Sequence, residues 1–570
     1  MDKEFLARLR HSASHVMAQA VKELFPEAKL AIGPAIENGF YYDFDVPTPF
    51  TPEDLERITA RMQEIIAANV PITRAEVSRD EALRMFGEKN EPYKLELIRD
   101  LTDQTISTYT QDGFTDLCRG PHVERTGEIK AFKLLSVAGA YWRGSEKNPM
   151  LQRIYGTAWP TQELLDEYLE KLAEAERRDH RRLGKELDIF STHEEVGAGL
   201  IFWHPKGAMI RHLIEAFWKE EHLKRGYDFV YTPHIASEEL FRISGHLEKF
   251  SETMYAPLDI DGQPYRLKPM NCPGHIMIYK THLRSYRDLP IRYAELGTVY
   301  RYERSGTLQG MLRVRGFTQD DAHIFCTPEQ LVDEVVGVLD FVDFVMKRFG
   351  YKYKAYLATR PEKSIGTEEV WKHATNSLIK AMEARGMEYE TDPGGGAFYG
   401  PKIDIKLYDA LGHEWQGPTV QADFNLPERF NVNYVGQDGA EHRAVMIHRV
   451  VLGSMERFVG GLIEHYGGAF PLWLAPKQVI MLPIAERHTE YARKVADKLQ
   501  AAGLRVQVDD RSEKTGFKIR EAQVQKIPYM LVIGNREVEQ GTVSVRSRDE
   551  GDQGVMSVDE FLSKAQAEIG

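Results

Sequence analysis

Hydrophobic and polar positions alternate along residues 299–303, in the manner of a strand with one buried face. Serine, glycine and glutamine between 305 and 310 supply turn chemistry, and apolar positions recur along residues 312–324. The pattern predicts two strands joined by a turn.

The rest of the central region has both helical and strand patterns. A helix is expected over 207–225, where Gly226 ends it, and a strand over 227–233 leads to a proline. Three further alternating stretches predict antiparallel strands, at 291–295, 402–408 and 417–425. Together these elements predict a mixed, mostly antiparallel sheet flanked by helices.

The order of elements changes near the C-terminus, after two prolines within 470–476 interrupt a helix expected over 446–466. Strands and helices then alternate, which predicts an α/β domain with a largely parallel sheet. The expected strands are 478–482, 504–508, 529–533 and 541–546, and the expected helices are 489–501, 517–524 and a final one.

A charge-rich helical pattern over residues 161–185 predicts a linker helix. Roughly 100–200 residues per domain suggests three or four domains for 570 residues. The linker and the break at 470–476 supply the boundaries. The predicted fold class is therefore α+β multidomain. We expect an N-terminal α+β domain at 1–160, the linker at 161–185, the central domain at 186–472 and the C-terminal domain at 473–570.

Composition limits the class of protein. A hydrophobic content of 42% with 28% charged residues is that of an ordinary globular protein. No run of about 18 uncharged apolar residues exists, and the first ten residues lack the apolar core of a signal peptide. The net charge of −13 argues against a protein that coats nucleic acid indiscriminately, although a nucleic-acid partner bound at one place needs only local positive surface. Three cysteines cannot form a disulfide framework and fit a reducing cytoplasm.

The predicted hairpin carries side chains suited to a nucleotide. Arg301 and Arg313 can grip phosphate bidentately, and Phe317 can stack on a base. For any single arginine, a surface hairpin covered in solvated charge is the alternative. The pattern Arg301-x-Glu303, followed by a loop and residues 313–317, resembles motif 2 of class II aminoacyl-tRNA synthetases. With the sequence Thr-Gln-Asp-Asp-Ala-His at 318–323, the segment resembles threonyl-tRNA synthetases, and the resemblance covers nearly the whole chain.

Two other segments extend this resemblance. Residues 207–233 resemble motif 1, which in the class builds a dimer interface, and Gly453 to Arg457 resembles motif 3. The resemblance implies a homodimer, and it implies that the enzyme uses ATP with Mg²⁺. Fixed cations are needed because a carboxylate attacks a polyanionic phosphate slowly unless they absorb the developing charge. The implied ATP-binding residues are Arg301, Glu303, Arg313, Phe317 and Arg457.

Three residues far apart in the chain, Cys272, His323 and His448, are implied to bind a metal. Each histidine alone reads more simply as a hydrogen-bonded core residue. In threonyl-tRNA synthetases the matching positions bind one zinc ion, and a thiolate with two imidazoles suits Zn²⁺ and leaves one position open. Such an open zinc ion would take the amine and the hydroxyl of L-threonine directly and refuse valine, which lacks the hydroxyl. The implied threonine-binding residues are Gln319, Asp321, Tyr399, Lys402 and Gln416, with Asp321 accepting the hydroxyl proton.

Serine keeps the hydroxyl and lacks only a methyl group, which is worth ~1–3 kcal/mol, too little for translation. A second, hydrolytic site is therefore expected. His11, His15, Cys118 and His122 look by spacing alone like a zinc site. The resemblance implies instead a metal-free editing domain for mischarged Ser-tRNA(Thr), with His11 as the base. The implied editing residues are His11, His15, Lys94, Asp116, Cys118 and His122.

The C-terminal domain resembles the anticodon-binding domain of several class II enzymes. This resemblance implies contacts to the anticodon of tRNA(Thr) from Arg511, Lys526, Glu537 and Arg546. Ser512 departs from the pattern, because many relatives have asparagine at that position. Most bacterial relatives also carry a small ubiquitin-like domain before the editing domain, and here the chain begins almost directly at His11. We expect either that this lineage lost the ubiquitin-like domain or that the sequence starts late.

Three functions compete at this point. The leading one is threonine activation, transfer to tRNA(Thr) and editing. A catalytically idle relative that binds RNA as a regulator is disfavoured by the complete set of arginines and zinc ligands. An enzyme that transfers the same kind of adenylate to another acceptor is disfavoured by the presence of both editing and anticodon modules.

Overall fold

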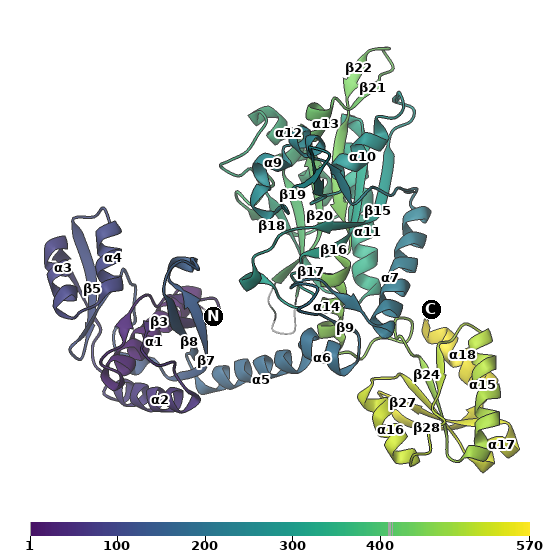
Figure 1. The fold of residues 1–570 in the computed structure, drawn as a ribbon, viewed down its shortest axis with the longest axis horizontal. Helices are drawn as coiled ribbons and strands as arrows, with labels where there is room; N and C mark the ends of the chain where they lie inside the picture. The colour runs from purple at the N-terminus through teal and green to yellow at the C-terminus, as the bar shows by residue number, and fades with distance from the viewer. Residues whose placement is uncertain (1, 409–411, 413, 570) are drawn as a thin grey trace. The chain divides into compact units, whose positions relative to one another are not determined.

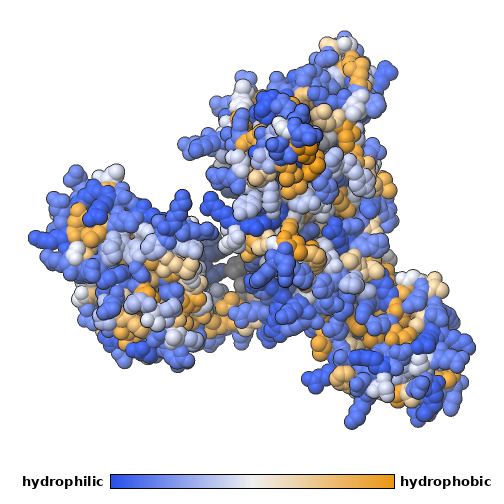
Figure 2. All heavy atoms as spheres, viewed as in Figure 1, coloured by the Kyte–Doolittle hydropathy of each residue, from blue (hydrophilic) through white to orange (hydrophobic). Residues whose placement is uncertain are grey.

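The computed structural model describes residues 2–408, 412 and 414–569, which form two compact units that meet between Ala173 and Glu174. No helix among these residues is both long and apolar enough to cross a membrane. Hydrophilic residues cover most of the face seen in Figure 2, and the large apolar side chains are mainly internal.

The first unit contains two antiparallel sheets (Figure 1). One has the order β1-β3-β8-β7, with β2 paired to β3, and the other has the order β4-β5-β6. The strands are β1 Lys29–Leu30, β2 Ala35–Ile36, β3 Gly39–Asp45, β4 Thr73–Ser78, β5 Thr105–Gln111, β6 Phe114–Leu117, β7 Ala131–Tyr141 and β8 Met150–Trp159. The helices are α1 Lys3–Leu24, α2 Pro52–Ala67, α3 Arg79–Glu88 and α4 Pro92–Asp100.

Helix α1 supplies the core of this unit. Asp2 caps it by accepting a hydrogen bond from the Glu4 N–H (2.9 Å), which satisfies one of the free donors of its first turn. Val16 and Met17 on its buried face pack with Phe40 and Phe44 of β3. This packing fixes α1, and with it the histidines at 11 and 15, against the sheet.

The second unit is built around an eight-stranded sheet with the order β11-β15-β16-β23-β20-β19-β17-β18 (Figure 1). The edge pairs β11/β15 and β17/β18 are parallel and all other pairs are antiparallel, as predicted. Its strands are β11 Asp228–Phe229, β15 Ile291–Tyr300, β16 Gly316–Cys326, β17 Tyr353–Ala358, β18 Tyr389–Asp392, β19 Lys402–Tyr408, β20 Glu414–Asp423 and β23 Val445–Val450.

One face of this sheet is covered by helices and the other carries the polar site. Ala322 and Ile324 of β16 join the large apolar core with helices α7 Pro205–Lys224, α11 Leu331–Arg348, α12 Glu368–Ala384 and α14 Met455–Tyr466. Because side chains alternate along a strand, Gln319, Asp321 and His323 lie on the opposite face. Four shorter helices belong to the same region, α8 Glu238–Ser244, α9 His246–Lys249, α10 Cys272–Tyr279 and α13 Asn425–Phe430.

The C-terminal part of the second unit has a five-stranded sheet with the order β25-β24-β26-β27-β28. Only β25, β24 and β26 are parallel, so the prediction of a largely parallel sheet was wrong for its other half. Helix α17 and strand β28 were not predicted. The elements are β24 Val479–Pro483, α15 Thr489–Ala501, β25 Val506–Val508, α16 Thr515–Val524, β26 Tyr529–Ile533, α17 Asn535–Gln540, β27 Thr542–Ser547, β28 Gly551–Ser557 and α18 Val558–Ile569.

Two predicted strands have different limits. The strand expected over 227–233 is only β11, because the N–H of Thr232 donates to the Glu295 carboxylate (2.8 Å) in place of a neighbouring strand. In the predicted hairpin, β15 ends at Tyr300 and β16 begins at Gly316. The N–H of Arg315 donates to Gly199 O (2.7 Å), so the connecting loop, residues 301–315, pairs partly with a segment outside the hairpin.

Two predicted helices also differ. The linker expected over 161–185 is broken into α5 Gln162–Arg178 and α6 His180–Glu186, because Asp179 leaves the helical conformation and accepts from the Arg181 N–H (2.7 Å). The helix expected over 446–466 begins at Met455, where Ser454 accepts from the N–H of Arg457 (3.2 Å). Residues before this cap are β23 and a turn.

Candidate active site

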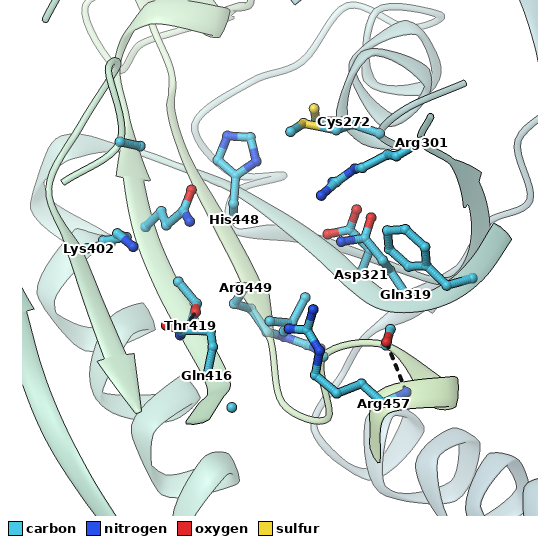
Figure 3. A pocket seen from close by; sticks show the side chains of 18 of the residues that line it. Cys272, Arg301, Gln319, Asp321, Lys402, Gln416, Thr419, His448, Arg449 and Arg457 are labelled. Carbon is cyan, nitrogen blue, oxygen red and sulfur yellow. Dashed lines mark hydrogen bonds between the residues drawn. The ribbon is translucent and has the colours of Figure 1, made fainter. Parts of the chain in front are cut away.

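The register between β16 and β23 brings two of the predicted metal ligands together. His323 and His448 are direct partners across these strands, with 3.0 Å between His323 Nε2 and His448 Nδ1. Cys272 is the first residue of α10 and points toward the same point (Figure 3). The ligand atoms of all three lie within 4.8 Å of one another, although the residues are distant in the sequence.

The chemistry of these three groups fits a bound zinc ion. Burial raises the pKa of the Cys272 thiol well above its usual value, and the nearby Asp321 and Asp423 carboxylates raise it further. Burial also lowers the pKa of His323, which stays neutral with a lone pair for a metal. A thiolate at this buried position requires a cation beside it to offset these effects. A bound metal ion supplies that charge and deprotonates a coordinating thiol.

The predicted nucleotide-binding residues line the same cavity of about 470 Å³. The Arg301 guanidinium lies 5.2 Å from the Phe317 ring centre, and its Nε donates to Pro269 O (3.2 Å). Arg313 pairs with Glu303 across the loop (3.0 Å). Arg457, on the first turn of α14, donates from Nε to Leu312 O (3.0 Å). All five predicted ATP-binding residues therefore line one cavity, and Figure 3 shows Arg301 and Arg457 among them.

The electrostatics of this end of the cavity favour an anion. Burial lowers the pKa of Arg301, and among the smaller causes the positive charge of Arg457 lowers it as well. Burial and then the positive charge of Arg313 lower the pKa of Arg457. Arginine remains charged in proteins, so the positive charge gathered by these three residues, of which Arg313 is paired with Glu303, attracts phosphate.

The predicted amino-acid pocket lies beside the metal ligands in the same cavity. Asp321 accepts from Asn271 Nδ2 (3.1 Å) and lies 3.7 Å from His323 Nε2. The Gln319 side-chain oxygen is buried without a hydrogen-bond partner among the described residues. Tyr399 OH donates to the Gln421 amide oxygen.

The far wall of this pocket is held by Asp404 of β19. Its carboxylate pairs with Lys402 Nζ (2.6 Å) and accepts from Gln416 Nε2 (3.0 Å). Thr419 Oγ1 also donates to Asp404 (3.1 Å). The structure therefore brings all five predicted threonine-binding residues to one cavity, with Lys402 and Gln416 engaged with Asp404.

Sequence reasoning missed several residues that organise this site. His275 contacts His323, one of the predicted metal ligands. Asp320 accepts from the N–H groups of Val451 and Leu452 (2.9 and 2.8 Å) just before the motif 3 turn. His180 of α6 accepts from the Met311 N–H (3.0 Å) and donates to Glu464 (2.7 Å), so it fastens the 301–315 loop. His275 stands three residues after Cys272, a proximity that could have signalled it; the others carry no local signal.

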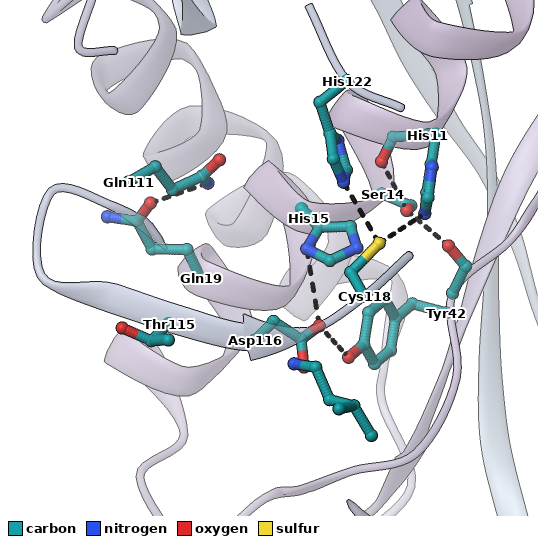
Figure 4. Close-up of polar contacts among 12 residues, drawn as sticks. His11, Ser14, His15, Gln19, Tyr42, Gln111, Thr115, Asp116, Cys118 and His122 are labelled. Carbon is teal, nitrogen blue, oxygen red and sulfur yellow. Dashed lines mark hydrogen bonds and ion pairs between the residues drawn. The ribbon is translucent and has the colours of Figure 1, made fainter. Parts of the chain in front are cut away.

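The first unit holds a second cluster, formed by His11, His15, Cys118 and His122 (Figure 4). The Cys118 sulfur lies 3.3 Å from His11 Nε2 and 3.2 Å from His122 Nε2. These residues come from α1 and from the segment after β6, and their ligand atoms all lie within 4.8 Å. The geometry alone accommodates either a metal ion or a metal-free hydrolytic site.

A buried ion pair lies beside this cluster. Asp116 accepts from Lys94 Nζ (2.6 Å) and from Tyr42 OH (2.6 Å), and Lys94 Nζ also donates to Tyr42 OH (2.8 Å). His15 Nδ1 is 3.4 Å from the same carboxylate. Tyr42, which sequence reasoning missed, therefore belongs to the set that the structure brings together (Figure 4).

The protonation of the cluster is set mainly by burial. It raises the pKa of Cys118 to about 11, and it lowers the pKa of His11, His15 and His122. The three imidazoles are therefore neutral at pH 7, and His11 can accept a proton from a water molecule. His11, His15 and Cys118 line a cavity of about 680 Å³, which Arg74 and Arg119 also line.

The predicted anticodon-binding residues lie on separate elements of the C-terminal part. The Arg511 guanidinium binds both oxygens of Asp509 (2.8 Å each), and Glu537 accepts from the Gly534 N–H (2.8 Å) at the start of α17. Arg546 lies on β27 and Lys526 precedes β26. Arg511 and Glu537 are thus engaged within the protein.

Known families match three segments of the chain. The models are the tRNA synthetase class II core domain (G, H, P, S and T) at residues 255–466, the anticodon binding domain at 478–568, and the threonyl and alanyl tRNA synthetase second additional domain at 106–155. With the sheet and the arginine-lined cavity, they define a class II aminoacyl-tRNA synthetase.

Comparison with individual relatives shows which family within this class the chain belongs to. The threonine–tRNA ligase of Dehalococcoides mccartyi (strain CBDB1) is 60% identical over 562 residues, which cover 98% of this chain and 96% of the relative. That of Pelobacter propionicus is 60% identical over 560 residues, which cover 98% and 88%. A solved RNA binding domain of threonyl-tRNA synthetase from Cryptosporidium parvum Iowa II is 42% identical with a TM-score of 0.66, over 68% of this chain and 98% of that one. The chain belongs to the threonine–tRNA ligase family, which confirms the resemblance and the fold class predicted from the sequence.

Proposed function

We propose that this chain activates L-threonine with ATP, releases pyrophosphate and transfers the threonyl group to tRNA(Thr). The observation that carries this proposal is a single cavity lined by the three arginines, by Asp321 and by the Cys272, His323 and His448 set. One end suits a polyphosphate and the other suits a small hydroxylated amino acid. Family membership supports the same activity.

At the nucleotide end, Arg301 would bind the α-phosphate, and Arg313 the γ-phosphate. Phe317 and Arg457 would hold the two faces of adenine, with Glu303 near its amino group. Fixed positive charge at Arg301 stabilises the charge that develops when the threonine carboxylate attacks the α-phosphorus. ATP would enter with Mg²⁺, which shares that charge.

At the amino-acid end, Cys272, His323 and His448 would hold one zinc ion per chain. When bound, zinc would take both the amine and the hydroxyl of threonine, because a site with three protein ligands can expand to five-coordinate. Asp321 would accept the hydroxyl proton, since its carboxylate is held beside His323 by Asn271. Gln319, Tyr399, Lys402 and Gln416 would orient the substrate from the walls of the same cavity.

Serine keeps both groups that this pocket recognises, and its missing methyl group gives only about 10- to 200-fold discrimination. We therefore assign hydrolysis of Ser-tRNA(Thr) to the first unit. Neutral His11 would take a proton from the attacking water. His15, Lys94, Asp116, Cys118 and His122 would hold the terminal ribose and the seryl amine, without a metal. The match to the second additional domain supports this assignment.

The remaining assignments extend this function along the chain. We assign editing to residues 1–160, a linker to 161–185, catalysis to 186–472 and anticodon binding to 473–570, where Arg511, Lys526, Glu537 and Arg546 would lie near anticodon bases. A homodimer is proposed through the region of α7 and β11. Tyr231 just after β11 is 77% exposed and Leu223 in α7 is 60% exposed, which fits an apolar surface covered by a second copy. The proposed location is the cytoplasm.

The proposed activity is tested by threonine-dependent ATP–pyrophosphate exchange, followed by charging of tRNA(Thr) with labelled threonine. Exchange and charging together are expected. Exchange without charging would indicate another acceptor for the adenylate. Failure of both, with tRNA binding retained, would indicate an RNA-binding relative without synthetase activity.

A further inference from the structure

A buried line of side chains runs from Glu295 on β15 through His275 on α10 to the metal-binding residue His323. His275 Nε2 lies 3.1 Å from Glu295 Oε2, and His275 Nδ1 lies 2.8 Å from His323 Nδ1. The three residues are 4%, 0% and 1% exposed. Water therefore does not compete for these contacts, and each must be a hydrogen bond within the protein.

The protons along this line can be assigned from one end to the other. Glu295 also accepts from the Thr232 N–H and hydroxyl (2.8 Å each), and Lys268 Nζ lies 3.5 Å away, as expected for an ionised carboxylate. It accepts only, so His275 Nε2 donates to it. With its proton on Nε2, His275 offers the lone pair of Nδ1 to the Nδ1–H of His323. The lone pair of His323 Nε2 is left facing the metal-binding position.

A second, shorter line leads to the other imidazole. His448 Nε2 donates to Asp423 Oδ2 (2.8 Å), which leaves the lone pair of its Nδ1 facing the same position. The bare nitrogens of His323 and His448 are 3.0 Å apart. Two lone pairs that face each other repel unless a cation lies between them. Two nitrogen ligands at ~2.0–2.1 Å from a tetrahedral zinc ion stand roughly 3.3 Å apart, close to the observed separation.

We propose that His275 is a positioning residue of the metal site. Its two hydrogen bonds link the Glu295 carboxylate to His323 and hold the His323 ring in its metal-binding tautomer. The inference rests on the zinc site assigned above. His275 acts through another residue and touches neither zinc nor substrate. Glu295 also accepts a hydrogen bond from Thr232 and lies beside Lys268. These contacts connect the metal site to the segment that follows β11. Outer partners of metal-binding histidines typically contribute 10- to 100-fold in metal affinity.

A purely structural role for His275 makes a different prediction, and two variants separate the roles. His275→Leu fills the space without hydrogen bonds. His275→Gln keeps an acceptor that can face His323 and a donor that can face Glu295. If His275 only fills the core, both variants should bind zinc as the original chain does. If it positions His323, the leucine variant alone should bind zinc weakly.

The experiment measures zinc per full-length chain by mass spectrometry after dialysis against a graded series of a zinc chelator. We expect 10- to 100-fold weaker binding for His275→Leu and a change below about threefold for His275→Gln. His222→Leu is the matched control, because His222 is equally buried and, among the described residues, its side chain is hydrogen-bonded only to the Trp218 carbonyl oxygen (2.6 Å). It should leave zinc affinity unchanged.

The outcomes separate this inference from the zinc site itself. If the original chain retains no zinc even without chelator, the zinc site is wrong and the inference falls with it. If the original chain binds zinc and His275→Leu binds it equally tightly, His275 has no positioning role. Circular dichroism checks folding. Should His275→Leu fail to fold, Glu295→Gln removes the charge with little change of shape, and unchanged zinc affinity in that variant overturns the inference.

Discussion

Replacement of Asp116 by leucine should separate a structural from a hydrolytic role of the buried pair in the first unit. Asp116 is 1% exposed, and its carboxylate is the only charged partner that the structure records for Lys94, which is 2% exposed. Asp116→Leu leaves the ammonium group with the Tyr42 hydroxyl alone (2.8 Å). Leaving one buried charge unpaired costs about 3–5 kcal/mol.

Hydrogen exchange measured by mass spectrometry reports this cost locally, which suits a chain of several units. At 1.36 kcal/mol per factor of ten, peptides from β5 and β6 should exchange roughly 150- to 5,000-fold faster. Peptides from the second unit provide the internal control. A second substitution, Lys94→Met, removes the unpaired charge and should restore most of the protection.

Hydrolysis of Ser-tRNA(Thr) gives the functional half of the test. Both Asp116→Leu and the double variant should lose it and keep threonylation, because Lys94 and Asp116 are proposed to hold the seryl end. Hydrolysis that returns with stability in the double variant would reduce the pair to a structural role. A change in exchange below about tenfold in Asp116→Leu would contradict the energetic reasoning.

Four further predictions follow from the geometry. Cys272→Ser should lose bound zinc and threonine-dependent pyrophosphate exchange together, and near-normal exchange without zinc would contradict the metal assignment; removal of zinc by a chelator should act in the same way. His11→Ala should keep threonylation and lose about 10²- to 10⁴-fold in hydrolysis of Ser-tRNA(Thr), as expected for loss of a general base, whereas unchanged hydrolysis would refute that role. His180→Leu should raise KM for ATP more than KM for threonine, because His180 fastens the loop that carries Arg313; equal effects on both would argue against it. Alkylation of Cys118 should rise about tenfold per pH unit from pH 7 toward its pKa of about 11, since burial keeps the thiol protonated, and a plateau below pH 9 would contradict this value.

Local sequence patterns predicted many of the strands and helices of the second unit. The alternation at 402–408 matches β19, and the helix expected at 489–501 matches α15. Element limits failed where a side chain replaced a backbone partner. Glu295 ended the strand after Phe229, and Asp179 broke the linker helix, because each carboxylate accepts from a backbone N–H. Such contacts come from one residue and carry no periodic signal.

The candidate sites show a similar division. The sequence by itself determined which side chains are available, and the alternation along 319–323 already placed Gln319, Asp321 and His323 on one face of a strand. Resemblance to a family, and not spacing, grouped Cys272 with two distant histidines. The position of His275 three residues after Cys272 marks it as a candidate, but its contact with His323 could not be predicted from spacing or resemblance, because it depends on how α10 packs against β16.

Only the tertiary structure decided how these groups meet. Strand register set His323 opposite His448, and the packing of α1 brought His11 within 3.3 Å of Cys118. Burial then set their protonation, since removal from water disfavours the charged forms of both imidazole and thiol. The identity of the reactive groups is thus local information in the chain. Their distances, tautomers and pKa values arise from contacts between segments that no local pattern specifies.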